Sequence, residues 1–450
     1  MSKWVRSPAH NQRQDVVQMC EYLSEERHLY KDEFLAKEVV FAKLWPQDSF
    51  DDARMRQSIH FFNKALEEFL IYNEVRQDSI FTKTALARVF RKRRLNKPFE
   101  KNLKQIHSLQ EKYPFRNAHY LRNEYLIQAE RYTYLSGFRK RTTDFNLQET
   151  SDALDTTFMA DKLRQACLIL SHQNVYQTHY KVGLLDEVLS YIESDSITDE
   201  PAITIYYYTY KALTEKNNPD HFHSLKEAII SQGSKFPKAE IRDIYLLAIN
   251  YCIGQINAGN KAFIRETFDL YREGIEKKIL ADEKNISGWT FQNAILNALM
   301  LKEFEWVENF INQYQDLLDT NFRDAVVNYS LARLYYEKED YDKSMGYITQ
   351  TEFNDILINL NAKTLLLKIF YEQQELNVLE SLLESMRNYI VRKKVMGYHK
   401  SNFKNIIRYT RKLVKVNPFN KAHVNKLKEE ISTANPLSER EWLLRQLNVI

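Results

Sequence analysis

One stretch of the chain recurs in pattern about 35 residues later, and this repeat restricts the possible folds more than any other feature. In the first copy, at 328–348, apolar and small side chains follow helical spacing, stop at a short polar turn and resume. The second copy, at 363–383, has the same arrangement. A helix pair of this size cannot bury its own apolar face, so we expect the copies to stack on one another. The equivalent positions are Leu331 and Leu366, Ala332 and Leu367, Tyr335 and Phe370, Tyr341 and Leu376, Ser344 and Leu379, and Ile348 and Leu383.

Composition supports helices joined by short turns. Only nine glycines and nine prolines occur in 450 residues, far below the usual shares of about 7% and 5%. Hairpins and phosphate-binding loops both need glycine, because they require a positive φ or a close backbone approach. The 44% of hydrophobic residues is enough for a buried core, and the length exceeds one compact core. We therefore expect several domains or one long stack, without a Gly-rich nucleotide-binding fold.

Helical patterns alternate with short turns along most of the sequence. We divide the chain into an N-terminal helical segment at 1–75, a basic helical region with a connector at 76–150, and a helical-repeat array at 151–450. The expected helices lie at 31–44, 52–72, 80–95, 99–112 and 118–136; after a connector at 137–152 come the pairs 154–173 with 182–193, 203–213 with 221–231, 239–256 with 261–277, 287–300 with 303–318, the two copies above, 400–414 with 421–431, and a last helix at 438–447.

The repeat spacing resembles the tetratricopeptide repeat, in which a small residue of the first helix meets a small residue of the second. Ala332 and Ser344 occupy these positions in the first copy, whereas Leu367 and Leu379 occupy them in the second, and neither copy has the usual closing proline. The resemblance implies an all-α fold of helical hairpins stacked into a right-handed solenoid, with an N-terminal helical cap domain. It covers about 290–385 and is weaker over 155–290. A looser third copy carries Ala294, Ala298, Phe304, Val307 and Ile311.

The same resemblance implies a concave face, formed by the first helix of each unit, that holds a peptide or protein segment. Arg333 and Lys368 are equivalent, as are Tyr336 and Tyr371, so stacked repeats would present cations flanked by tyrosine rings. Such a surface suits an acidic segment or one ending in a carboxylate. The alternative is that these are ordinary solvated helix positions whose rings pack on the next repeat. Carried over by position, the groove residues are Tyr329, Arg333, Tyr336, Thr364, Lys368 and Tyr371.

The stretch 36–70 is similar to the helical core of winged-helix modules, in which a Leu-Trp-Pro phrase ends one helix and the next helix reads DNA. Here that phrase is Leu44-Trp45-Pro46. No β-hairpin pattern follows Leu70, and the helix in the reading position is apolar. The alternative is a helical cap that shields the first repeat.

Cations gather in two zones of an otherwise mildly charged chain (net charge +4). Like charges on one helix repel, so a phosphate backbone or an acidic partner would favour the clusters. Alternatively, acidic faces of adjacent helices, such as Glu67, Glu68 and Glu74, neutralise them. The first zone holds Lys83, Arg88, Arg91, Lys92, Arg93, Arg94, Lys97, Lys101 and Lys104; the second holds Arg392, Lys393, Lys394, Lys400, Lys404, Arg408, Arg411, Lys412 and Lys415.

The sequence carries no catalytic motif of the HExxH, GxSxG, GxxxxGK[ST] or GxGxxG kind. His221 and His223 lack a cysteine partner, and Cys20, Cys167 and Cys252 are widely separated in apolar patterns. We therefore expect no enzyme, no cofactor and no metal, and three buried thiols in a reducing compartment. No stretch of 18 apolar residues and no signal-peptide core occurs, which favours a cytoplasmic protein without a membrane contact.

Two functions fit these observations. The first is a non-catalytic scaffold that binds a partner protein segment along the solenoid surface. The second is a nucleic-acid-associated regulator that uses the basic helices, with the repeats as sensor. The helical, glycine-poor composition rich in Tyr, Asn and Lys also resembles cytoplasmic proteins of Bacteroidetes, a resemblance that implies no mechanism. Neither the partner nor the oligomeric state follows from the sequence.

Overall fold

A computed structural model describes residues 1–137, 145–176, 178–195, 200–351, 353–393 and 397–449. In these ranges the secondary structure is helical, and the one β-type pairing is an isolated bridge between Ala281 and Ile286. The chain forms two compact units: Met1–Tyr207 with Ser234–Phe236, and Tyr208–Gly233 with Pro237–Ile450. The predicted all-α class is confirmed. The predicted segments 1–75 and 76–150 lie in the first unit, and 151–450 extends over both.

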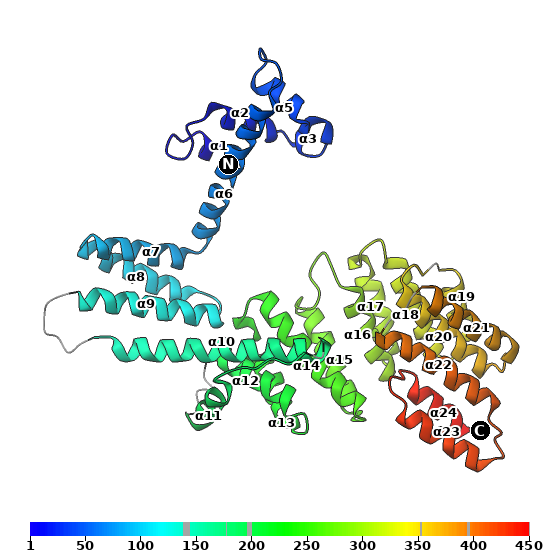
Figure 1. The fold of residues 1–450 in the computed structure, drawn as a ribbon. Helices are drawn as coiled ribbons and strands as arrows, with labels where there is room; N and C mark the ends of the chain where they lie inside the picture. Colours follow the sequence, from blue (N-terminus) through cyan, green and yellow to red (C-terminus); the bar gives the residue numbers. More distant parts are fainter. Residues whose placement is uncertain (138–144, 177, 196–199, 352, 394–396, 450) are drawn as a thin grey trace. The chain divides into compact units, whose positions relative to one another are not determined.

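The N-terminal part of the first unit is a cluster of short helices around a small apolar core of Met19, Phe41, Leu44 and Met55. The helix expected at 31–44 is divided at Ala36, which has an extended backbone. The long helix α6 starts where the Asp51 carboxylate accepts hydrogen bonds from two backbone N–H groups. No strand follows it within 78–137, so a wing is absent there. The helices are α1 (Ser2–Val5), α2 (Gln14–Leu23), α3 (Glu26–Leu29), α4 (Asp32–Leu35), α5 (Lys37–Leu44) and α6 (Asp52–Gln77) (Figure 1).

Longer helices follow in the same unit, and Phe99 stacks on Tyr134 between two of them with ring centroids 3.9 Å apart. The sequence predicts a helix that begins at 99, after Pro98, but Pro98 lies in the first turn of α8. Its missing N–H has no intrahelical acceptor to lose there. The expected connector 137–152 is helical from Leu147 onward, and its residues 138–144 lie outside the described part. These helices are α7 (Ser79–Lys92), α8 (Asn96–Lys112), α9 (Ala118–Ser136), α10 (Leu147–Tyr176) and α11 (Leu185–Asp195); α12 (Pro201–Thr214) contains the boundary between the units.

The second unit is a series of stacked helix pairs, as the repeat predicted. Each helix packs against its neighbours in sequence, and α16, α18 and α20 also contact one another in order, so the first helices of successive pairs form a row (Figure 1). The helices are α13 (Pro219–Gln232), α14 (Lys238–Asn257), α15 (Phe263–Glu276), α16 (Gly288–Met300), α17 (Phe304–Tyr314), α18 (Arg323–Glu337), α19 (Tyr341–Thr349), α20 (Ile356–Glu372), α21 (Leu376–Arg392), α22 (Gly397–Lys415), α23 (Lys421–Thr433) and α24 (Arg440–Val449).

The small pair of the first copy lies where the two helices of a unit cross. The Ser344 hydroxyl donates a hydrogen bond to the Ala332 carbonyl oxygen at 2.7 Å, and both residues are fully buried. Two small side chains let the backbones of α18 and α19 approach closely enough for this contact. In the second copy Leu367 and Leu379, also buried, fill the equivalent space.

The turn between the two helices of a unit is the same in three successive units. Lys302, Glu339 and Gln374 each adopt a left-handed backbone, with φ of 60°, 62° and 61°. In each case the next N–H donates to a carbonyl of the preceding helix, at 2.8–2.9 Å, which is a Schellman-type cap. None of the three is glycine, so the residue type does not predict this cap. The same cap follows α7 and α15, at Arg94 and Lys278, so it is a common helix end in this chain.

Candidate protein-binding surface

The six predicted groove residues lie together on one face of α18 and α20, because spacings of three and four residues share a helix face. Lys368 places its ammonium nitrogen 4.6 Å from the centre of the Tyr336 ring, so a cation and a tyrosine of neighbouring repeats do meet. Arg333 is half-buried and the other five, Tyr329, Tyr336, Thr364, Lys368 and Tyr371, are buried. The expectation of an open surface is therefore not met. Side chains from 439–446 of the same chain contact it at Lys368, Tyr371 and the adjacent Glu372.

An ion pair joins the groove to the residue before α24. The Lys368 ammonium lies 3.2 Å from a carboxylate oxygen of Glu439, and the two side chains are 8% and 24% exposed. Burial disfavours the charged form of Glu439, but Lys368 and the guanidinium of Arg333 outweigh it and lower the pKa of that carboxyl. Burial acts to lower the pKa of the Arg333 guanidinium, but the neighbouring Tyr329 and Glu439 outweigh it, so the pKa is raised. Both predicted cations thus face the same acid.

The carboxylate of Glu372, at the end of α20, accepts four hydrogen bonds. Tyr336 donates to one oxygen at 2.8 Å, and Tyr341 donates to the other at 2.9 Å. Trp442 and Gln446 of α24 donate their side-chain N–H groups to the first oxygen at 2.8 and 3.0 Å. Burial and the neighbouring carboxylate raise the pKa of Tyr341 to about 12 and also raise that of Tyr336, so both hydroxyls remain donors at neutral pH.

α24 has a second, apolar face. Leu443 and Leu447 are buried in a core shared with α22 and α23. Trp442 lies between the two faces: its indole N–H reaches Glu372, and its ring meets Tyr371 edge-on with centroids 5.5 Å apart. The helix is thus held by polar contacts on one side and apolar packing on the other.

Sequence reasoning missed the four residues that complete this site: Glu372, Glu439, Trp442 and Gln446. A signal existed, because positions 439, 442 and 446 share one face of a helix and combine an acid, an indole and an amide. The predicted partner was an acidic segment of another protein. The acid observed against this face, Glu439, belongs to the chain itself, and its segment 439–446 holds two Glu and two Arg.

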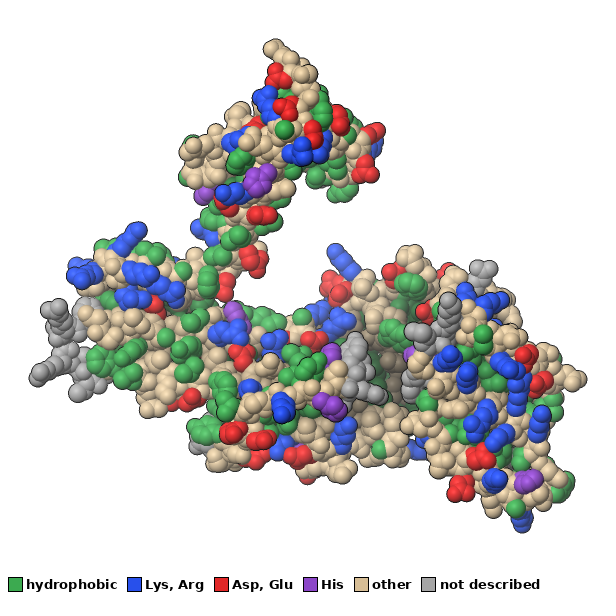
Figure 2. Space-filling view, viewed as in Figure 1, with side chains coloured by type: hydrophobic (Ala, Val, Ile, Leu, Met, Phe, Trp, Pro, Cys, Tyr) green, Lys and Arg blue, Asp and Glu red, His purple; other side chains and the backbone are tan. Residues whose placement is uncertain are grey.

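A second surface is the first basic zone, on α7 and α8 (Figure 2). Arg88 and Arg91 pair with Glu130 of α9, which replaces the predicted neutralising residues Glu67, Glu68 and Glu74. Lys83 donates to Gln105 at 2.7 Å. Other members of the zone are exposed, and no ion pair reaches them from the described residues. They are Lys92, Arg93, Arg94, Lys97, Lys101 and Lys104.

Three of the nine cations of the second basic zone pair with acids of adjacent helices. Arg411 lies 2.9 Å from Glu380 and 3.0 Å from Glu384 of α21. Lys412 pairs with Glu430 of α23, and Arg408 lies 4.0 Å from the same residue. The predicted neutralisation thus holds for these three cations. No ion pair from the described residues reaches the exposed members Arg392, Lys393, Lys400, Lys404 and Lys415. Lys394 lies outside the described residues.

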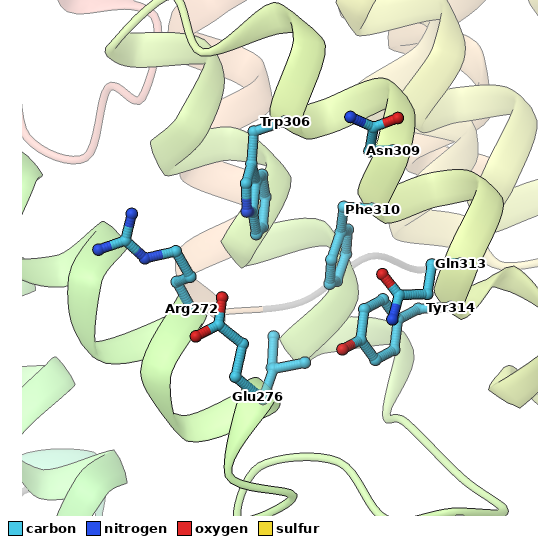
Figure 3. A pocket seen from close by; sticks show the side chains of 8 residues that line it. Arg272, Glu276, Trp306, Asn309, Phe310, Gln313 and Tyr314 are labelled. Atoms are coloured by element: carbon cyan, nitrogen blue, oxygen red, sulfur yellow. The ribbon is translucent and has the colours of Figure 1, made fainter.

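A pocket of about 300 Å³ lies between α15 and α17 (Figure 3). Trp306, Phe310 and Tyr314 follow one another along α17, and the first two rings are stacked with centroids 4.7 Å apart. Arg272 and Glu276 of α15 form the opposite side. The three aromatic residues recur every four positions in the sequence, which places them on one face of α17.

Chemistry-bearing side chains do not assemble elsewhere in the described chain. His221 contacts Glu215 at 2.8 Å, and no group of three His, Cys, Asp or Glu residues could hold a metal within the described ranges. The three cysteines are buried, as predicted, and all are free thiols. None of the described helices is both long and apolar enough to cross a bilayer. Comparisons with protein-family models, curated proteins and solved structures each found no match.

Proposed function

We propose that this protein is a non-catalytic scaffold that binds a helical segment of a partner protein on the face formed by α18 and α20. One observation carries the proposal: a cation predicted to bind an acidic group of a partner segment binds one within the chain, since Lys368 pairs with Glu439 at 3.2 Å. The same face offers an acceptor for donors on the bound helix, the Glu372 carboxylate.

The chemistry of this face suits recognition of a protein segment. Buried tyrosine rings provide contact area at a low cost in side-chain entropy. The ion pair and the hydrogen bonds of Glu372 fix the register and direction of a helix, because each needs its partner at one position. A helix lying in an apolar groove with a few polar anchors is a common mode of peptide recognition.

Affinity capture from a native lysate, followed by mass spectrometry, tests the proposal. The bait is the full chain, and the control is the triple variant Arg333→Ala, Lys368→Ala, Tyr371→Ala, checked for helical content by circular dichroism. We expect a set of proteins that the wild-type chain retains and the triple variant loses. Identical sets from the two baits would contradict binding at this face.

The exposed cations at the α7–α8 turn support a second candidate function, binding of nucleic acid. Lys92, Arg93, Arg94 and Lys97 are exposed without an ion pair from the described residues, so they are available to phosphates. Binding of a random duplex at about 50 and 200 mM salt tests this candidate. A steep loss of affinity at the higher salt, abolished by neutralising Arg91 to Arg94, would support it. Affinity that does not change with salt would contradict it.

A further inference from the structure

We propose that α24 is the resident occupant of the α18–α20 face and that the partner carries a helix of the same pattern, which displaces it. This inference rests on the proposed function and specifies the partner. The pattern is an acid, an indole three positions later, and an amide four positions after that, as in Glu439, Trp442 and Gln446.

Each element of the pattern meets one feature of the groove. The acid pairs with Lys368 beside Arg333. The indole N–H and the amide N–H both donate to Glu372, the acceptor that α20 provides. A competing helix that lacked the acid would leave Lys368, which is buried, without its carboxylate. One that lacked the two donors would leave Glu372 with only its tyrosine partners.

The apolar side of α24 adds a further requirement. Leu443 and Leu447 are fully buried against α22 and α23, so removal of α24 exposes apolar surface there. A partner helix covers that surface only if it also has leucine-like residues one position after the indole and one position after the amide. The partner is therefore an amphipathic helix with one polar and one apolar edge.

The length of the resident helix favours its displacement. α24 spans only Arg440–Val449, and a helix of ten residues is marginal without its packing. Its polar anchors contact Lys368 and Glu372 of α20. The non-helical segment before it is held by hydrogen bonds from Asn402 and Asn405 of α22 to Ser438 and Pro436, so this segment remains as the tether. A tethered occupant competes at a millimolar effective concentration, so the groove accepts a partner only when the partner binds more tightly than α24.

The test uses a labelled peptide of residues 436–449 as the probe and measures its binding to the full chain by fluorescence anisotropy. In an anchor variant, Trp442→Ala with Gln446→Ala, the resident helix is weakened. We expect the peptide to bind this variant at least about tenfold more tightly than the wild-type chain, in which α24 competes. Adding Lys368→Glu to the anchor variant abolishes binding, and a peptide with Glu439→Lys restores it.

A second measurement needs no variant. Hydrogen exchange of the wild-type chain should show α24 exchanging faster than α20 and α22, because it opens on its own. Equal protection of α24 and α20, or no gain of peptide binding in the anchor variant, would identify α24 as a fixed cap and overturn the inference. A dimer that exchanges α24 between two copies would overturn the assignment to a separate partner.

The experiments distinguish failure of this inference from failure of the proposed scaffold function. If the peptide binds the anchor variant but affinity capture finds no protein that depends on the groove, the recognition pattern stands and the scaffold function fails. If capture succeeds and the peptide does not bind, the scaffold function stands and the pattern taken from α24 is wrong.

Discussion

The indole N–H of Trp442 donates to the carboxylate of Glu372 at 2.8 Å, across 70 residues of sequence. This bond ties α24 to the end of α20, at a site where two tyrosines of α18 and α19 donate to the same carboxylate. Three repeat helices and α24 thus share one acceptor. Because the two residues are far apart in sequence, this bond forms only when the second unit is folded.

Glu372→Ala should lower the free energy of unfolding by about 3 kcal/mol. The substitution removes the acceptor from four donors, of which Tyr336 and Trp442 are buried and Tyr341 and Gln446 half-buried. Unsatisfied buried donors cost about 1–3 kcal/mol each, partly recovered by relaxation and water. Urea denaturation followed by tryptophan fluorescence measures the change. The control is Glu375→Ala, an exposed residue whose side chain makes no cap hydrogen bond, which should stay within about 0.5 kcal/mol. Equal effects of the two would contradict the role of Glu372.

The ion pair of Glu439 should make stability depend on pH. Because the folded pKa of Glu439 lies below its ordinary value of 4.5, the pair stabilises the fold fully above that value and progressively less as the pH falls through the folded pKa. At pH 7 Glu439→Gln should cost about 3 kcal/mol, since Lys368 is left buried without its partner.

The difference between the wild-type chain and Glu439→Gln should therefore shrink below pH 4.5. Denaturation midpoints of both proteins at pH 3.5 and pH 7 check the effect. The exposed Glu441 provides the matched control, because Glu441→Gln should leave the pH dependence of the wild-type chain unchanged. A constant difference across this range would show that the ion pair does not stabilise the fold.

Gln374→Gly should stabilise the second unit by about 1 kcal/mol. Gln374 has a φ of 61°, which costs a residue with a Cβ about 1–2 kcal/mol, and glycine avoids this cost despite its greater freedom when unfolded. Its neighbour Gln373 has a φ of −84° and is the matched control. Gln373→Gly should give no gain. Thermal denaturation of both variants distinguishes them, and an equal response would contradict the cap assignment.

The thiols should be inert in the folded protein. Cys20, Cys167 and Cys252 are all buried, and burial raises the pKa of Cys167 and of Cys252, so the reactive thiolate is scarce. We expect Ellman's reagent to label none of the three under native conditions and all three in guanidinium chloride. Rapid labelling of Cys167 or Cys252 without denaturant would contradict their place in the core.

The sequence by itself determined the class of fold and its unit. Helical spacing around Ala332 and Ser344, together with the scarcity of glycine, predicted stacked helix pairs, and their 2.7 Å contact follows from two small residues at a helix crossing. Local spacing is sufficient to predict a helix pair, because its two helices are nearly contiguous in sequence.

Only the tertiary structure decided what the groove residues contact. Spacing placed Lys368 on the correct face of its helix, but nothing local could bring Glu439 to it, because that contact depends on where α22 and α23 direct the chain. The same limit applies to Arg88 and Arg91. They pair with Glu130 of α9, whereas the sequence pointed to acids that lie on α6. Periodicity fixes which side of a helix a residue occupies, whereas the identity of its partner depends on packing between helices distant in sequence.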